Sequence, residues 1–312
     1  DKGYRILNAA QSKMDKMTVG IVGLGLIGGS MAIDLRRRGF ASEILGVEAE
    51  PVNASAALNI GLADEIVDLE QCIDRSDIVV LSVPVGTAVK MLPMVLDRFA
   101  ETRPGPDPAY VSSGVCCKKI VIDVCSTKAS LVEAVRNHPA RRRYVATHPM
   151  AGTEYSGPWA AQPGLFDGRA CIICNGDDSD RDAVEAIEAL YDCLNMRLTS
   201  MDASAHDVHT AYVSHISHIT SFALALTVLD KEKDEKHIFD LASGGFSSTV
   251  RLAKSNADMW VPILSQNRDN VLKVMDTYIE KMNEFRDAIS SGDEERIREL
   301  IGEANRIKRI LR

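Results

Sequence analysis

Short apolar runs alternate with helix-like stretches through the first part of the chain. The apolar runs, predicted as strands, cover residues 18–22, 44–48, 78–83, 120–124 and 144–147. The stretches between them, predicted as helices, cover residues 26–38, 51–59, 87–99 and 128–137. Because the strands are apolar at nearly every position, both faces of their sheet must be covered, as in parallel sheets. The pattern predicts an α/β fold with a doubly wound parallel sheet, completed by strands 170–174 and 196–201 around a helix at 181–194.

Strand patterns vanish after Asp202, and the rest of the chain is predicted to be helical. Residues 203–229 form one long helix that is apolar nearly all round, so we expect it to be buried, partly against a second subunit. A loop at 240–248 follows, and then a very long helix at about 257–291. Gly292 ends that helix, and Asp293 caps a final helix that runs to Leu311.

A glycine-rich turn joins the first predicted strand to the first helix. It reads Gly23-Leu24-Gly25-Leu26-Ile27-Gly28. The first glycine permits a tight turn, the second lets the backbone approach a pyrophosphate, and the third lets helix and strand pack closely. The helix N-terminus adds a partial positive charge. Between a strand and a helix, this motif predicts a Rossmann-type dinucleotide site, with a glycine turn of another α/β protein as the alternative.

The dinucleotide is expected to be NAD. Glu48, at the end of the next apolar run, is placed to accept the ribose hydroxyls and to repel a 2′-phosphate. NADP stays open, because Glu48 can turn away and Arg36, Arg37 and Arg38 lie nearby in the sequence. The predicted division is an N-terminal extension at 1–17, an NAD-binding Rossmann domain at 18–202 and an all-helical substrate and dimerisation domain at 203–312.

Charge and cysteine usage narrow the class of partner. A net charge of −8 argues against a nucleic-acid surface and means that an anionic substrate needs a local cation. We expect no membrane partner, because no run is read as long enough to span a bilayer and no signal peptide is visible. Seven scattered cysteines, an odd number, indicate reduced thiols and a cytoplasmic protein.

Polar residues follow three of the predicted strands. In an open α/β sheet, ligands bind beyond the carboxyl ends of the strands. Ser82-Val83-Pro84, with Thr87 in the helix that follows, is therefore expected at the cofactor, with a plain turn as the alternative. Ser126 is expected to touch the cofactor or the substrate, with a simple helix cap as the alternative. His148, in His148-Pro-Met-Ala-Gly-Thr153-Glu154, is a candidate general base.

Four of the seven histidines fall between residues 206 and 218. On a regular helix His206 and His209 share one side, and His215 and His218 share roughly the opposite one, so we expect no metal site. His215 and His218 lie in the apolar stretch and are expected to be buried, with one of them contacting substrate. The glycine-opened segment Gly244 to Arg251 supplies a cation for a carboxylate, or only a surface salt bridge.

Together these motifs resemble the prephenate/arogenate dehydrogenase family over nearly the whole chain, from about Met17 to Leu311. The glycine turn, Asp123-x-x-Ser126-x-Lys128, His148-Pro-Met-Ala-Gly152, His206-Asp207 with Ser214-His215-x-x-His218, and Gly244-Gly-Phe to Arg251 occur in the family's order. The resemblance implies NAD-dependent oxidative decarboxylation of prephenate to 4-hydroxyphenylpyruvate, for tyrosine biosynthesis. It also implies a homodimer joined through the helical domain.

The resemblance also implies roles for individual residues. His148 would be the general base for the substrate hydroxyl, and Ser126 would orient that hydroxyl and His148. Arg251 would hold a substrate carboxylate, while His218, Ser214, Gly244 and Thr153 would line the pocket. Glu154 is hypothesised to lie near Arg251 and to gate entry.

The sequence departs from the family at Ser247 and Ser248, where members often carry a basic residue. This keeps arogenate, whose oxidation gives tyrosine directly, as an alternative substrate. More remote alternatives are a β-hydroxyacid-type dehydrogenase, which would place a catalytic lysine in the helical domain, and a non-catalytic NAD-binding dimer.

Overall fold

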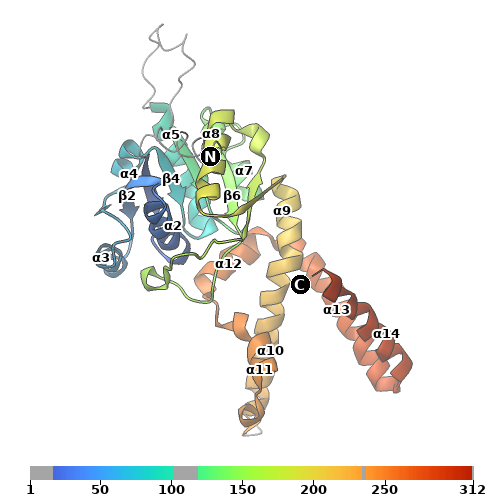
Figure 1. Ribbon diagram of the computed structural model, residues 1–312. Coiled ribbons are helices and arrows are strands. Elements are labelled where there is room, and N and C mark those ends of the chain that lie inside the picture. The colour runs from blue at the N-terminus through green and yellow to red at the C-terminus, as the bar shows by residue number, and fades with distance from the viewer. Residues whose placement is uncertain (1–16, 102–118, 234–236, 311–312) are drawn as a thin grey trace, which may run out of the picture.

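The computed structural model describes residues 17–101, 119–233 and 237–310. Nearly all of the predicted N-terminal extension, most of the stretch between the helix at 87–99 and the strand at 120–124, and the predicted end of the last helix lie outside these residues. The described part divides visibly into a globular sheet region and helical arms that extend from it (Figure 1).

One eight-stranded sheet organises residues 17–101 and 119–201, in the order β3-β2-β1-β4-β5-β6-β7-β8. Its strands are β1 Met17–Val22, β2 Ala41–Val47, β3 Glu65–Ile66, β4 Ile78–Leu81, β5 Ile120–Asp123, β6 Tyr144–Pro149, β7 Ala170–Cys174 and β8 Arg197–Met201. The chain order reverses between β1 and β4, which creates the crevice at which such sheets bind ligands.

Helices cover both faces of this sheet. They are α2 Leu26–Arg37, α3 Pro51–Asn59, α4 Leu69–Arg75, α5 Val85–Glu101, α7 Ala129–Ala134 and α8 Arg181–Cys193. Side chains alternate along β1, so that Val19 and Ile21 join the core beneath α2 and α8, whereas Val22 joins the core beneath α5. This confirms the predicted doubly wound α/β fold.

Three details of the sheet differ from the sequence prediction. The short strand β3 and the helix α4 were not predicted, because two paired residues and seven helical ones give little periodic signal. The sheet is also not wholly parallel, because β7 pairs with β6 antiparallel, with His148 opposite Ile172. A buried strand is apolar on both faces in either direction, so the pattern could not reveal this reversal.

The helical part begins with α9 Ala203–Thr210, the π-helical turn η5 Ala211–His215 and α10 Ile216–Glu232, which form one continuous long helix. Where we predicted a loop at 240–248, the chain forms η6 Ile238–Leu241 and α11 Gly244–Thr249, followed by η7 Arg251–Lys254. The single helix predicted at 257–291 is two helices, α12 Ala257–Gln266 and α13 Arg268–Ser291.

Contacts with other elements explain the break between α12 and α13. Asn267 lies at the break, and its buried side-chain amide donates a hydrogen bond of 2.6 Å to the carbonyl oxygen of Asp207 in α9. The end of α13 follows the prediction, because Gly292 adopts φ +69° and Asp293 caps α14 Glu294–Ala304 by accepting from the Arg296 amide. The turn η8 Asn305–Arg309 ends the described part.

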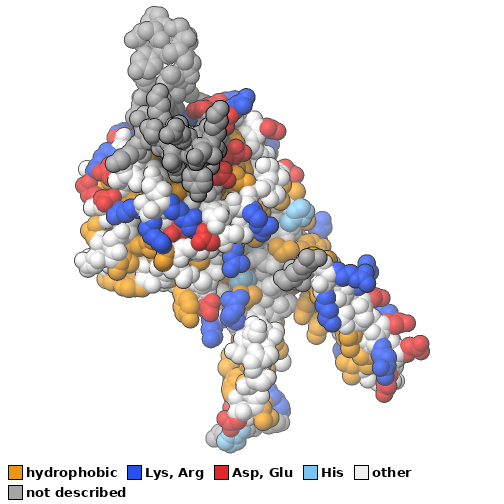
Figure 2. Space-filling view, viewed as in Figure 1, with side chains coloured by type: hydrophobic (Ala, Val, Ile, Leu, Met, Phe, Trp, Pro, Cys, Tyr) orange, Lys and Arg blue, Asp and Glu red, His pale blue; other side chains and the backbone are white. Residues whose placement is uncertain are grey.

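The long helix is not buried within one protomer, contrary to expectation. Only 11% of its most apolar window is covered, and by length and composition the span Ala203–Glu232 could cross a membrane. The expectation that no run reaches that length was therefore wrong. Val213, Leu226 and Leu229 are exposed on it, and apolar side chains likewise face outwards on the arm built by α13 and α14 (Figure 2).

Candidate active site

The glycine turn after β1 has the geometry of a phosphate-binding loop. Gly23 has φ +92°, and a Cβ there would collide with the Ser82 carbonyl. Gly28 packs against the Gly23 carbonyl with no room for a side chain. By contrast, the Cβ position of Gly25 is open, with its nearest neighbour 4.0 Å away, and no side chain caps the first turn of α2. The turn therefore leaves an open cradle at a helix N-terminus, which fits a dinucleotide pyrophosphate.

Glu48 lies directly beside this cradle. One of its carboxylate oxygens accepts a hydrogen bond of 3.0 Å from the Leu24 amide, so the side chain is held at the turn. Leu26 and Ile27 continue from there as the first residues of α2. A carboxylate fixed in this position suits ribose hydroxyls and disfavours a 2′-phosphate.

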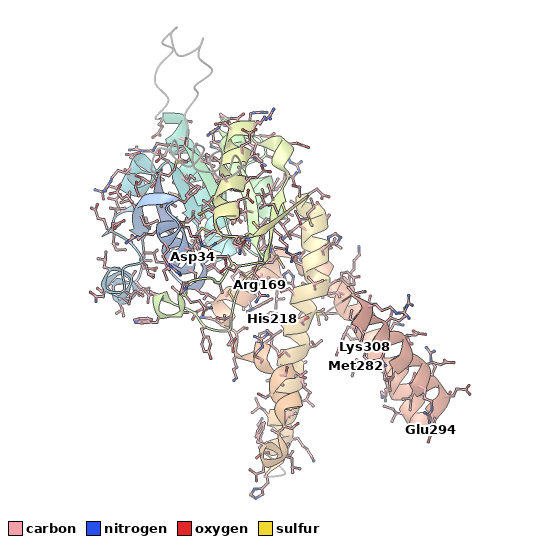
Figure 3. The ribbon with its side chains drawn as sticks, viewed as in Figure 1. Asp34, Arg169, His218, Met282, Glu294 and Lys308 are labelled. Carbon is pink, nitrogen blue, oxygen red and sulfur yellow. The ribbon has the colours of Figure 1, made fainter. Side chains whose placement is uncertain are left out.

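The three arginines for which NADP was kept as an alternative cofactor lie against acidic side chains of the protein. Arg36 donates to Asp64 at 2.9 Å, and Arg38 donates to Asp167 at 2.7 Å. Arg37 lies 3.6 Å from the buried Asp34, which is labelled in Figure 3 within the sheet region. The residues around the cradle thus fit NAD.

The ends of β4 and β5 meet beside the glycine turn. Ser82 follows β4 directly, and its carbonyl oxygen packs on Gly23. The Val83 carbonyl accepts from the Cys125 thiol at 3.6 Å, and this contact ties the two strand ends together. Pro84 and Thr87 are exposed at the start of α5. Ser126 is half-buried in the turn between β5 and α7.

His148 lies near the end of β6, beyond the last residues that pair with β5. Its side chain is 8% exposed, and its Nδ1 lies 2.8 Å from Nε2 of His206 in α9. Burial holds the pKa of His148 well below its ordinary value, and the neighbouring His206, Lys128 and His215 lower it further. A ring kept uncharged in this way has a free lone pair at neutral pH, which a general base requires.

A buried polar network lies beneath His148. Lys128 and Asp123 form a completely buried ion pair, and the Lys128 ammonium also donates to the Thr147 carbonyl at 2.7 Å. Asp123 accepts from the Tyr144 hydroxyl at 2.7 Å as well. A buried pair is tolerated only when its remaining hydrogen bonds are satisfied. The network fixes the ends of β5 and β6, and with them Ser126 and His148.

The helical histidines are not arranged as predicted. His206 and His215 are both completely buried, whereas His209 is exposed. A regular helix turns by about 100° per residue and would place His206 and His215 about 180° apart. The π turn at Ala211–His215 takes up an extra residue, so the two rings need not lie on opposite sides as they would on a regular helix. Both rings in fact lie close enough to His148 to lower its pKa. No cluster of metal-ligating side chains occurs in residues 17–101, 119–233 and 237–310.

His218 lies on the part of the long helix that passes α12 (Figure 3). Its Nδ1 donates to the Ser214 carbonyl at 3.0 Å, and its ring stacks on Trp260. Burial lowers the pKa of His218, as it does that of His215, which is lowered to about 4. Both rings are therefore neutral hydrogen-bonding groups at pH 7.

Arg251 and Glu154 form an ion pair of 3.3 Å across 97 positions of sequence. The two residues are therefore neighbours, as hypothesised. Thr153, next to Glu154, accepts from the Tyr155 amide through its hydroxyl. Gly244 lies exposed at the start of α11, and a Cβ added there would meet nothing within 4 Å.

Several residues that shape the site were given no role from the sequence. They are Asp123, Lys128, His206, Asp207, Trp260 and Asn267. The adjacent polar pair His206-Asp207 at the start of a long helix was a visible signal, but nothing in its spacing indicated contact with His148.

Comparisons with known proteins agree with this geometry. The family described as "Prephenate dehydrogenase, nucleotide-binding domain" matches residues 31–103 and 109–200, and "Prephenate dehydrogenase, dimerization domain" matches residues 202–303. A prephenate dehydrogenase of Bacillus subtilis is 30% identical over 90% of this chain and 72% of its own. A cyclohexadienyl dehydrogenase of Zymomonas mobilis is 28% identical over 94% and 96%. The crystal structure of an Aquifex aeolicus prephenate dehydrogenase in complex with hydroxyphenyl propionate and NAD⁺ superposes with a TM-score of 0.80, at 29% identity over 96% of this chain and 99% of that one.

Proposed function

Because this chain belongs to the prephenate dehydrogenase family, we propose that its site converts prephenate to 4-hydroxyphenylpyruvate. The protein is an NAD-dependent oxidoreductase. The single observation that supports the proposal best is the position of His148, a buried, uncharged base at the sheet edge that also carries the glycine cradle.

Bound NAD supplies the hydride acceptor. The substrate carbon that loses hydride also bears a hydroxyl, whose proton passes to Nε2 of His148. The bond from the ring to its carboxylate then breaks as carbon dioxide leaves, and its electron pair makes the ring aromatic. The phenolate oxygen takes back one proton, so the reaction consumes and releases no net proton.

The remaining site residues are proposed to bind and orient the substrate. Ser126, in the turn after β5, orients the hydroxyl and His148. Arg251 forks onto a substrate carboxylate once it leaves Glu154, since a guanidinium binds carboxylates in two-point contacts. The pocket lining is proposed to be Ser214, His218, Thr153 and Gly244. The proposed cofactor contacts are Gly23 to Gly28, Glu48, Ser82, Val83, Pro84, Thr87 and Ser126.

Arogenate is a second candidate substrate, favoured by one local feature. The exposed turn of α11 carries Ser247 and Ser248 and offers no cation, while Glu154 offers a carboxylate beside Arg251. The ammonium group of arogenate can pair with that carboxylate, whereas the keto group of prephenate cannot. The relative from Zymomonas mobilis, a cyclohexadienyl dehydrogenase, adds weight to this alternative.

A homodimer and the division at residues 202 and 203 belong to the same proposal. The exposed apolar faces of the long helix and of α13 need a partner, and the dimerisation-domain match spans both (Figure 2). A second copy would also cover the helix long enough to span a membrane. The expected mass in solution is twice the 34.0 kDa of one chain. The cytoplasm is the proposed location, because the described cysteines are free thiols.

One assay tests the function. NAD reduction is followed with prephenate and then with arogenate, for the wild type and for His148→Asn. The wild type is expected to turn over at least one substrate, and the variant to lose about 10²- to 10⁴-fold in kcat, as for removal of a general base. NAD affinity, measured by titration, should be unchanged in the variant. A wild type that turns over neither substrate would overturn the proposal.

A further inference from the structure

Three buried side chains form a chain of hydrogen bonds that ends at His148. Oδ1 of Asp207 lies 2.8 Å from Nδ1 of His206, and Nε2 of His206 lies 2.8 Å from Nδ1 of His148. All three are under 9% exposed. Asp207 and His206 come from α9 and His148 comes from β6, so this series of hydrogen bonds connects the helical part to the sheet region.

The direction of these hydrogen bonds follows from the partners of Asp207. Its Oδ1 accepts from the Lys128 amide at 2.8 Å, and its Oδ2 accepts from the Ala129 amide at 2.9 Å. An ionised carboxylate only accepts, and both of its oxygens already face N–H donors. Nδ1 of His206 must therefore carry the hydrogen that points at Asp207.

The tautomers of the two rings then follow in order. A neutral imidazole has one donor and one acceptor nitrogen, so Nε2 of His206 is an acceptor. Nδ1 of His148 donates to it, which leaves the lone pair of His148 on Nε2. This is the atom to which the proposed function assigns proton removal.

We propose that His206 and Asp207 are positioning residues that hold His148 in the tautomer with its lone pair on Nε2. The proposal rests on the proposed function for its catalytic meaning, but not for the tautomer itself. The other charged or titratable groups around His148 are Lys128 from the turn after β5, with Asp123 paired to it, and His215 from the π turn. Their combined effect keeps the ring neutral, so that it can exist as a single tautomer.

A purely structural role for Asp207 is the competing explanation. Asp207 holds the start of α7 through two amides, and its own carbonyl accepts from Asn267. Loss of this side chain could lower activity merely by loosening contacts between α7, α9 and the start of α13. The experiment must therefore report on the tautomer and on coupling to His206.

The first measurement is nitrogen NMR of the intact wild-type protein labelled with ¹⁵N-histidine, at a pH where both rings are neutral. His148 and His206 are each expected to carry hydrogen on Nδ1 and not on Nε2. Assignment uses the spectra of His148→Asn and His206→Gln. Hydrogen on Nε2 of His148 would overturn the proposal, and this readout stands even if the wild type turns over neither substrate.

The second measurement is a double-mutant cycle on kcat. Asp207→Asn alone is expected to lower kcat by about 10²- to 10⁴-fold, since loss of tautomer control in a Ser-His-Asp triad costs about 10⁴. In the background of His206→Leu, the same change is expected to cost less than about twofold, because the relay is already broken. Equal losses in both backgrounds would mean that Asp207 acts only through folding.

Two further variants complete the test. His206→Gln can still accept from Nδ1 of His148 and should retain at least about tenfold more activity than His206→Leu, an energy of about one hydrogen bond. His209→Leu is the matched control, because His209 is exposed on the same helix, and its kcat should stay within about twofold of the wild type. Equal activities of His206→Gln and His206→Leu would contradict the relay.

Discussion

The imidazole of His218 lies flat on the indole of Trp260, with ring centroids 3.6 Å apart and planes inclined by 29°. Trp260 is buried in the same core cluster as the side chains beneath α5. The stack therefore fixes a histidine of the long helix against the sheet region. The position of the His218 ring therefore depends on α12, which carries Trp260, as much as on the long helix.

Replacing Trp260 by a smaller apolar side chain should shift the His218 ring while the protein stays folded. Trp260→Phe keeps an aromatic face, so KM for the substrate should stay within about twofold. Trp260→Leu removes the stack and should raise KM by about two- to tenfold, matching the ~0.5–1.5 kcal/mol of an aromatic pair. Steady-state kinetics at saturating NAD measures both values. Equal KM values for the two variants would show that the stack does not position His218.

Glu154→Gln should lower KM for an anionic substrate. The substitution releases Arg251 from its ion pair, and a partly exposed pair of this kind contributes up to ~1 kcal/mol, or about fivefold. Arg251→Ala should raise KM instead, because the cation is lost. An unchanged KM in Glu154→Gln would argue against gating by this pair. If arogenate is the substrate, the sign reverses, since its ammonium loses a partner.

Glu48→Ala should weaken NAD binding and reduce the preference of the enzyme for NAD over NADP. The variant loses a charged acceptor for the Leu24 amide and the proposed ribose contact, which together should cost about tenfold in NAD affinity. Glu50→Ala, two residues further at the exposed start of α3, is the control of equal charge. The ratio of kcat/KM for the two cofactors measures the effect. A ratio unchanged from the wild type would remove Glu48 from cofactor choice.

Stability should fall as the pH is lowered from about 7.5 to 5. The pKa values of His148 and His215 are lowered on folding, that of His215 to about 4, so the unfolded chain binds these protons first. Their contribution is complete above the unfolded pKa of about 6.5 and declines below it, by up to ~1.4 kcal/mol per pH unit for each ring. Urea unfolding at fixed protein concentration measures this slope.

A histidine variant separates the protonation of the buried histidines from the effect of low pH on other ionisable groups. His215→Gln should reduce the slope, whereas His209→Gln should keep it, because His209 is exposed and lies away from the buried cluster. Equal slopes in all three proteins would mean that the buried histidines do not set the pH dependence.

The sequence by itself determined the features that depend on neighbouring residues. Examples are the turn from Gly23 to Gly28, the cap at Asp293 and the buried strands. The turn and the cap follow from local steric limits, and the strands follow from runs of apolar residues, so all three can be predicted from the sequence. Ser82, Ser126 and His148 could be placed at one edge because parallel strands end together. These features were enough to predict a cofactor cradle and a base.

Only the tertiary structure decided which side chains meet across the two parts of the chain. The hydrogen bond from His206 to His148 joins α9 to β6, and the stack of His218 on Trp260 joins the long helix to α12. The nearness of Arg251 and Glu154 was hypothesised from the sequence, but the geometry of their pairing was not. The energies of these contacts come from burial and hydrogen bonds formed after the helices pack on the sheet, and no periodic pattern encodes them. The exposed apolar faces of the helical arms were also decided only by the tertiary structure. A stretch that is apolar all round indicates that it must be buried, but not which surface covers it.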